Sequence, residues 1–166
     1  MLLRPSLRVD ELHQVDPALL VARGIRAVMV DLDDTLVATG SDRVATRHRK
    51  WLASLQEAGL EVLILSNGNR DRVTQWSRTL GIDGLALVGK PFGFAFRRGL
   101  RQLGRRASET AMIGDQLFTD VLGANLTGIM SILVTPLSPG GLPHTRALRQ
   151  LERMILGGPR GSSIHR

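Results

Sequence analysis

The sequence predicts a three-layer α/β domain in which a five-stranded parallel sheet lies between helices. Short apolar runs rich in β-branched residues alternate with segments of about ten residues whose apolar positions have helical spacing. Four of these runs lead directly into polar residues, as parallel strands do where they end at a binding crevice. With 166 residues and 43% apolar content, the chain has the size and composition of one globular domain.

The predicted strands are short, apolar and bounded by turn residues. The first closes in acidic residues, and the second ends at Ser66-Asn67-Gly68, a turn sequence. In chain order, the predicted strands cover residues 25–32, 60–65, 85–88, 111–114 and 129–134.

The predicted helices have recognisable starts and stops. Asp16 and Pro17 suit the cap and first position of a short helix that Gly24 ends, and Gly59 stops the next one. In chain order, helices are expected near 17–24, 46–58, 71–80, 92–103, 118–125 and 144–156. We therefore expect one domain over 1–156, with an ordered lead-in (1–24), a basic C-terminal helix (144–156) and a flexible tail (157–166).

The charge balance favours anionic partners. Lysine and arginine number 22 against 15 acidic residues, a net charge of +7, and only Lys50 and Lys90 are lysines. Such a surface attracts nucleic acid, acidic lipid or phosphate esters, although a genome rich in arginine codons would give the same composition. The basic residues that group on predicted helices are Arg97, Arg98, Arg101, Arg105 and Arg106 on one, and Arg146, Arg149 and Arg153 on the last.

Several classes of site and location are excluded by what the sequence lacks. The absence of cysteine rules out disulfides, thiolate nucleophiles and cysteine metal sites, and the four histidines are widely scattered. No run approaches the ~18 apolar residues that span a bilayer, and no signal peptide precedes the first strand. We expect a cytoplasmic protein that can bind peripherally at the inner face of the membrane.

Polar side chains follow four of the predicted strands. Because parallel strands end at the same edge of a sheet, these side chains are expected to converge on one crevice. They are Asp31, Asp33, Asp34 and Thr35 after the first strand, Ser66 and Asn67 after the second, Lys90 after the third, and Asp115 and Asp120 after the fourth.

This set of side chains suits phosphoryl transfer. Several carboxylates in one place repel each other and call for a hard cation, which points to Mg²⁺. Lys90 and the Ser66 hydroxyl can bind an anion, and a carboxylate can serve as nucleophile. A lone aspartate at a strand end most often caps a turn or helix, but Asp31 and Asp33 with a second acidic loop make that interpretation weak. Phosphate-loop and dinucleotide-binding glycine patterns are absent.

At these residues the sequence resembles the haloacid dehalogenase (HAD) superfamily of phosphatases, whose fold is Rossmann-like. The matching motifs are Asp31-x-Asp33-x-Thr35-Leu36, Ser66, Lys90, and Gly114-Asp115 with Asp120. The resemblance implies that Asp31 attacks phosphorus and that Asp33 protonates the leaving oxygen and then activates water. It also implies that Asp31, the Asp33 backbone carbonyl and Asp115 hold Mg²⁺, that Ser66, Asn67 and Lys90 bind the phosphoryl group, and that Asp34, Thr35 and Asp120 support the site.

A narrower likeness covers nearly the whole chain. Residues 114–128, Lys90-Pro91 and the lead-in resemble the YqeG family of HAD subfamily IIIA, which is similar to mitochondrial and plastid phosphatidylglycerophosphate phosphatases. The resemblance implies a phosphatase that converts phosphatidylglycerophosphate to phosphatidylglycerol. Asp34 and Gly68 depart from the pattern, since asparagine is expected at both positions. The extra carboxylate at Asp34 would alter metal affinity and not the reaction type.

The spacing of the motifs also bears on the substrate. The gaps from Asp33 to Ser66 and from Ser66 to Lys90 are filled by predicted helices and strands, so neither holds a cap domain. An uncovered crevice suits a phosphate on something large, such as a lipid at an anionic membrane surface. Phosphoprotein or nucleic-acid phosphate remains the alternative substrate, the latter disfavoured by an aromatic content of 4%. A non-catalytic basic adaptor with this fold is the third possibility.

Overall fold

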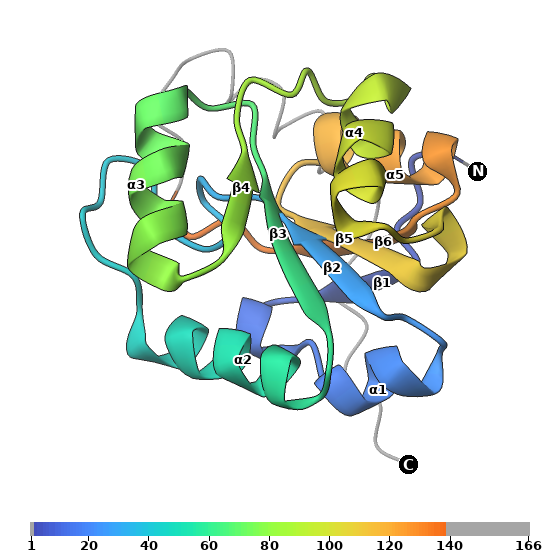
Figure 1. Ribbon diagram of the computed structural model, residues 1–166, viewed down its shortest axis with the longest axis horizontal. Coiled ribbons are helices and arrows are strands. Elements are labelled where there is room, and N and C mark those ends of the chain that lie inside the picture. The colour runs from blue at the N-terminus through green and yellow to red at the C-terminus, as the bar shows by residue number, and fades with distance from the viewer. Residues whose placement is uncertain (1, 139–166) are drawn as a thin grey trace.

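The computed structural model describes residues 2–138, in which a six-stranded parallel sheet lies between two layers of helices (Figure 1). The sheet order is β1-β6-β5-β2-β3-β4, and every neighbouring pair is parallel. The strands are β1 (Leu7–Val9), β2 (Ala27–Val30), β3 (Glu61–Leu65), β4 (Asp83–Leu85), β5 (Thr110–Gly114) and β6 (Met130–Val134). The predicted fold class is confirmed.

Within residues 2–138, five α-helices cover the two faces of the sheet. In Figure 1, α1, α2 and α3 lie on one side of the strands and α4 and α5 on the other. The bounds are α1 (Pro17–Ala22), α2 (Thr46–Glu57), α3 (Arg70–Leu80), α4 (Gly93–Leu103) and α5 (Leu122–Thr127), with a π-helical turn (Leu117–Val121) before α5 and short 3-10 turns at Leu12–Gln14 and Ala107–Glu109. The predicted cap of α1 forms: the Asp16 carboxylate accepts a hydrogen bond from the Ala18 amide at 2.9 Å.

The sheet has one strand more than the sequence predicts. Leu7 and Val9 of β1 pair with Ile132 and Val134 of β6, which places the lead-in at the sheet edge. Three residues with an exposed Arg8 in the middle are too short a pattern to stand out as a strand, because an edge strand needs only its inward side chains to be apolar. The predicted third strand, 85–88, has the wrong bounds. The observed strand β4 begins at Asp83 and ends at Leu85, and the chain then turns away from the sheet.

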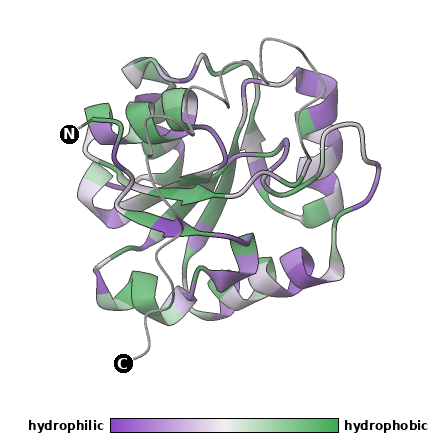
Figure 2. Cartoon of the chain, turned by 180° about the vertical axis from the view of Figure 1, so that it is seen from behind, coloured by the Kyte–Doolittle hydropathy of each residue, from purple (hydrophilic) through white to green (hydrophobic). Residues whose placement is uncertain are grey.

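The two halves of the core meet on the central strand β2, whose four residues are fully buried. Val28 and Val30 pack in the cluster under α2 and α3, whereas Met29 packs with α4 on the opposite face. A strand buried on both faces must be apolar throughout, which is why it is recognisable in the sequence. Figure 2 shows the hydrophobic strands between helices that carry their polar residues outward.

Within residues 2–138, the segments that join β2 to β3 and β3 to β4 contain one helix each, α2 and α3, and no inserted domain. Among the helices of this part of the chain, none combines the length and apolar composition needed to cross a bilayer. The predicted basic helix at 144–156 and the tail at 157–166 lie outside the described residues.

Candidate active site

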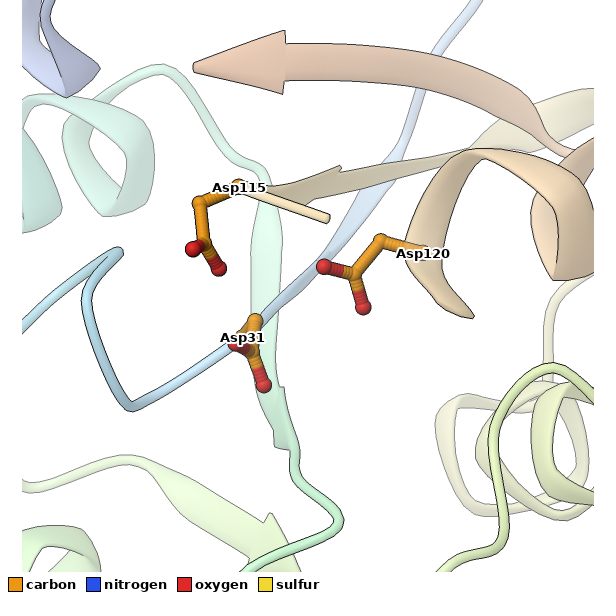
Figure 3. A group of neighbouring side chains, drawn as sticks. All are labelled: Asp31, Asp115 and Asp120. Carbon is orange, nitrogen blue, oxygen red and sulfur yellow. The ribbon is translucent and has the colours of Figure 1, made fainter. Parts of the chain in front are cut away.

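Three buried carboxylates meet at the carboxyl edge of the sheet. Asp31 directly follows β2, Asp115 follows β5, and Asp120 lies in the π-helical turn after it. Figure 3 shows the three side chains directed toward one another, and one oxygen of each lies within 4.8 Å of the others. The structure therefore brings together residues that the sequence placed on two separate motifs.

Lys90 lies between two of these carboxylates. Its Nζ is 2.7 Å from Asp31 Oδ1 and 2.7 Å from Asp120 Oδ1, and its side chain is only 2% exposed. Both amide atoms of Asn67 hold the backbone of Lys90: Asn67 Nδ2 donates to the Lys90 carbonyl at 3.1 Å, and the Lys90 amide donates to Asn67 Oδ1 at 2.8 Å. The side chain of Asn67 therefore positions the residue that reaches into the carboxylate cluster.

The electrostatics of the cluster favour a bound cation. Burial raises the pKa of Asp31 to about 7, with Asp120 adding to the rise and Lys90 opposing it. Burial lowers the pKa of Lys90, but the Asp120 and Asp31 carboxylates outweigh this and raise it above its ordinary value. The cluster holds three carboxylates and one ammonium group, which contacts only Asp31 and Asp120, so it is short of positive charge. Closely spaced, buried carboxylate oxygens are the donors that a hard divalent cation prefers, and the site fits such an ion.

Asp33 lies beside this cluster, and its carboxylate is held by Arg72 of α3. Its Oδ1 accepts a hydrogen bond from Arg72 Nε at 2.7 Å, and both side chains are partly exposed. Arg72 is not among the residues that the sequence predicts for the site. The one available signal is its place in the first turn of the helix that follows Ser66, which is weak in a chain with so many arginines.

Ser66 and Gly68 complete the edge of the site next to Asp33. The buried Ser66 hydroxyl accepts a hydrogen bond from the Gly68 amide at 2.9 Å. A Cβ atom at position 68 would lie 3.1 Å from Ser66 Oγ and 3.2 Å from Asp33 Oδ2. Glycine thus keeps the space between the hydroxyl and the carboxylate open, which is a physical reason for this departure from the expected asparagine.

Asp34 and Thr35 shape the loop after Asp33. Asp34 has φ of 61°, a left-handed conformation that aspartate and asparagine tolerate best among residues with side chains. Its carboxylate accepts hydrogen bonds from the Thr39 amide and the Ser138 hydroxyl, whereas the Thr35 hydroxyl donates to Asp115 Oδ1 at 3.3 Å. Asp34 therefore holds the loop, and Thr35 holds a member of the carboxylate cluster.

His48 of α2 holds the end of the same loop through a hydrogen bond. Its Nδ1 donates to the Leu36 carbonyl at 2.9 Å, and Nε2 is buried without a partner among residues 2–138. Burial lowers the pKa of His48 below its ordinary 6.5, so protons bind the unfolded chain more readily than the folded one. We expect the free energy of unfolding, measured with urea, to fall as the pH decreases below about 6.5.

The variant His48→Asn tests this assignment, because asparagine Nδ2 takes the place of His48 Nδ1 and can still donate to the Leu36 carbonyl but does not titrate. It is expected to lose part of the acid-side decrease in stability. His13→Asn, which removes an imidazole from the surface, is the control. An unchanged pH profile in His48→Asn would contradict the assignment.

Two family models match the chain. One, described as mitochondrial PGP phosphatase, matches residues 1–82, and the other, HAD-hydrolase-like, matches residues 87–136. Over 152 residues the chain is 38% identical to "Probable phosphatase YqeG" of Bacillus subtilis (strain 168), covering 92% of this chain and 88% of that one. This chain belongs to the YqeG family of HAD phosphatases. Like that family, it is a phosphoric monoester hydrolase, and the predicted resemblance is confirmed.

A more distant relative and two solved structures also match the chain, the structures in fold alone. "Phosphatidylglycerophosphate phosphatase 1, chloroplastic/mitochondrial" of Arabidopsis thaliana is 28% identical over 163 residues, which are 92% of this chain and 47% of that protein, so the chain spans about half its length. The 3-deoxy-D-manno-octulosonate 8-phosphate phosphatase of Moraxella catarrhalis, solved with magnesium and phosphate ions, matches with a TM-score of 0.51 at 20% identity over 82% of this chain and 77% of that one. An uncharacterised Listeria monocytogenes protein gives 0.57 at 20% identity over 72% and 85%. These structures show that the fold is shared.

Proposed function

We propose that this YqeG-family protein removes the terminal phosphate of phosphatidylglycerophosphate in a Mg²⁺-dependent reaction. The observation that carries the chemistry is the Asp31 carboxylate, buried at the centre of the sheet edge and held by Lys90 beside Asp115. The lipid substrate is supported by the PGP phosphatase family model and by the Arabidopsis relative. A site with no inserted domain over the strand ends in residues 2–138 also suits a phosphate carried by a membrane.

In the proposed reaction Asp31 attacks phosphorus while Asp33 gives a proton to the departing alcohol oxygen, which leaves a phosphoaspartate on Asp31. Asp33 then takes a proton from water, whose oxygen attacks the phosphoaspartate and releases inorganic phosphate. Ser66 and Lys90 bind the phosphoryl oxygens, and Asn67 contributes by anchoring Lys90. Mg²⁺, when bound, would offset negative charge on the phosphoryl group. Asp31, Asp115 and the Asp33 carbonyl would hold it, with Asp120 in support.

Arg72 has a place in this scheme because it contacts the acid–base residue directly. The guanidinium fixes the orientation of the Asp33 carboxylate, which has to serve first the leaving oxygen and then the water. A carboxylate with several rotamers would be aimed correctly for only part of the time. Arg72 is therefore a positioning residue in the proposed reaction.

Magnesium is expected to stabilise the folded protein through Asp115. A ligand present at about 100 times its dissociation constant adds roughly 2.7 kcal/mol to the free energy of unfolding, so Mg²⁺ should raise the thermal midpoint by several degrees. Asp115→Asn should lose most of that increase, and EDTA should abolish phosphate release by the wild type. Asp42→Asn, at a surface aspartate whose side chain is 88% exposed, is the control. A midpoint that Mg²⁺ leaves unchanged would contradict the proposed metal site.

The substrate is tested by measuring phosphate release from phosphatidylglycerophosphate in mixed micelles with Mg²⁺, with an aryl phosphate measured in parallel. Release from the lipid by the wild type, and not by Asp31→Asn, is the expected result. Cleavage of the aryl phosphate with the lipid left intact would refute the lipid substrate and leave the reaction class standing.

A further inference from the structure

The loop that carries Lys90 and the first turn of α4, together called the apolar loop, expose three large apolar side chains. Leu87, Phe92 and Phe94 are 59%, 65% and 57% exposed, respectively. The rings of Phe92 and Phe94 stack with centroids 5.9 Å apart, and the Phe94 ring packs over Gly89, where a Cβ atom would lie 2.9 Å from it. The chain from β4 into α4 thus turns Lys90 inward to the carboxylates and Val88 into the core, whereas Leu87, Phe92 and Phe94 face solvent.

Exposed apolar side chains concentrate at this edge of the sheet. Among residues 2–138, six large apolar side chains are exposed, and three of them, Leu87, Phe92 and Phe94, lie between the end of β4 and the first turn of α4. A further one, Leu137, is 38% exposed and is tied to the loop after β2, because its amide donates to the Asp34 carbonyl at 2.9 Å. Single exposed apolar residues are ordinary, but a group of them beside a catalytic crevice indicates an interaction surface.

Leu87 is also in an unfavourable backbone conformation. Its φ is 50°, a left-handed value that leucine rarely adopts and that glycine or asparagine would adopt more easily. The side chain gains little from burial in the folded chain, since more than half of it faces solvent. A strained backbone combined with an exposed apolar side chain is typical of a residue kept for a contact outside the chain.

Positive charge lies next to this apolar loop. Gly93 lies between Phe92 and Phe94 in the sequence. The guanidinium of Arg97 is next to it, since a Cβ atom built at Gly93 would be 3.0 Å from an Arg97 guanidinium nitrogen. Arg70 and Arg98 line a cavity of about 280 Å³, and Ala86, the residue before Leu87, is also part of its lining. α4 contains no acidic residue, and Arg70, Arg97 and Arg98 have no ion-pair partner among residues 2–138.

The basic cluster that the sequence predicts over residues 97–106 contains both paired and unpaired arginines. Arg105 is paired with Glu61, and Arg106 with Glu109, so these two arginines are neutralised within the chain. Of the same cluster, Arg97, Arg98 and Arg101 have no ion-pair partner among residues 2–138, and Arg97 and Arg98 are the two nearest in sequence to the exposed rings.

We propose that Leu87, Phe92 and Phe94 enter the surface of an anionic lipid bilayer, with Arg97 and Arg98 at the level of the lipid phosphates. This deepens the proposed function and rests on a lipid substrate. Aromatic and leucine side chains flanked by arginine are the composition that binds the interface between headgroups and acyl chains. Because Lys90 is on the same loop, docking of the loop would bring the membrane surface to the crevice.

The test is co-flotation of the full chain with vesicles of phosphatidylcholine, with and without phosphatidylglycerol. The wild type is expected to bind the vesicles that contain phosphatidylglycerol and to dissociate as salt is added. The double variant Leu87→Asn/Phe92→Ser is expected to bind them at least about tenfold more weakly. Leu126→Ser is the matched control: Leu126 is 56% exposed but lies on α5, and this variant should bind as the wild type does.

Both substitutions in the double variant suit the local backbone, so loss of binding would not come from unfolding. Asparagine accepts the left-handed conformation at position 87. Phe92 is the N-cap of α4 and makes no capping hydrogen bond, whereas serine is a preferred N-cap. The thermal midpoint should therefore be maintained or raised, and hydrolysis of a water-soluble aryl phosphate should be unchanged.

Insertion itself is measured with Phe92→Trp in vesicles that contain brominated lipid. The two native tryptophans, Trp51 and Trp76, are 4% and 2% exposed, so quenching is expected only from position 92. Failure of the wild type to float, equal binding by the double variant, or equal loss in Leu126→Ser would overturn the proposal. A change of oligomeric state in the double variant with vesicle binding unchanged would do so too, because it would identify a second copy as the partner.

The proposed substrate and the proposed surface can fail separately. Vesicle binding, with fluorescence quenching in the Phe92→Trp variant, but without release of phosphate from phosphatidylglycerophosphate would refute the substrate and support the surface. Release of phosphate from the lipid in micelles by a protein that never binds vesicles would refute the surface alone.

Discussion

Asp31→Asn is expected to reduce phosphate release by at least about 10³-fold, because an amide cannot attack phosphorus as a carboxylate does. Its structural cost should be small. Burial already disfavours the Asp31 carboxylate, as its pKa of about 7 shows, and Lys90 keeps its second partner, Asp120, at 2.7 Å. The thermal midpoint should therefore change by no more than about 4 °C, roughly 1 kcal/mol in a domain of this size.

Steady-state hydrolysis of an aryl phosphate and circular dichroism melting measure the two effects. Acid quenching of the wild type during turnover should trap phosphate on the protein, and the same quench of Asp31→Asn should trap none. Asp42→Asn makes the same chemical change at an exposed position and should leave both measurements unaltered. Turnover retained in Asp31→Asn would mean that another group, or water directly, attacks phosphorus.

Asp31→Asn also distinguishes an enzyme from a non-catalytic basic adaptor with this fold. An adaptor would cleave no phosphate ester even as the wild type, and Asp31→Asn would leave its partner binding intact. The membership of the YqeG family argues against this alternative, and the buried pairing of Asp31 with Lys90 gives the structural reason.

Lys90→Met is expected to damage both stability and activity. The substitution would leave the Asp31 and Asp120 carboxylates buried without their shared ammonium group. Removal of one partner from a buried ion pair typically costs about 3–5 kcal/mol, because the remaining charge is neither solvated nor paired. Loss of a cation that binds the phosphoryl group should also lower turnover by about 10²- to 10³-fold.

The chain contains its own control for this experiment, because its other lysine, Lys50, is exposed on α2. Lys50→Met should change the free energy of unfolding by no more than about 0.5 kcal/mol. The double variant Lys90→Met/Asp120→Asn should recover part of the lost stability without recovering turnover, since it removes an unpaired carboxylate but restores no cation. Equal stability of Lys90→Met and the wild type in urea unfolding would contradict the buried-pair account.

The sequence predicted the fold and most of the site for a definite physical reason. A strand buried on both faces has to be apolar throughout, so β2, β3, β5 and β6 were visible as runs, and the residues that end such strands have to share one edge of the sheet. The sequence missed β1, because an edge strand of three residues needs little apolar content. It misplaced β4, because Leu87 and Val88 look like strand residues but lie in a turn.

The sequence by itself determined which chemical groups stand at the carboxyl edge, since that depends only on the order of strands and motifs along the chain. Which of these groups touch was decided by the tertiary structure. Lys90 meets Asp31 across 59 residues and Arg72 meets Asp33 across 39, and both contacts depend on strand order and helix placement. The outward position of Phe92 and Phe94 likewise follows from how the chain turns between β4 and α4. Periodicity records whether a residue is buried or exposed within its own element, and it carries no information about what that residue meets from elsewhere in the chain.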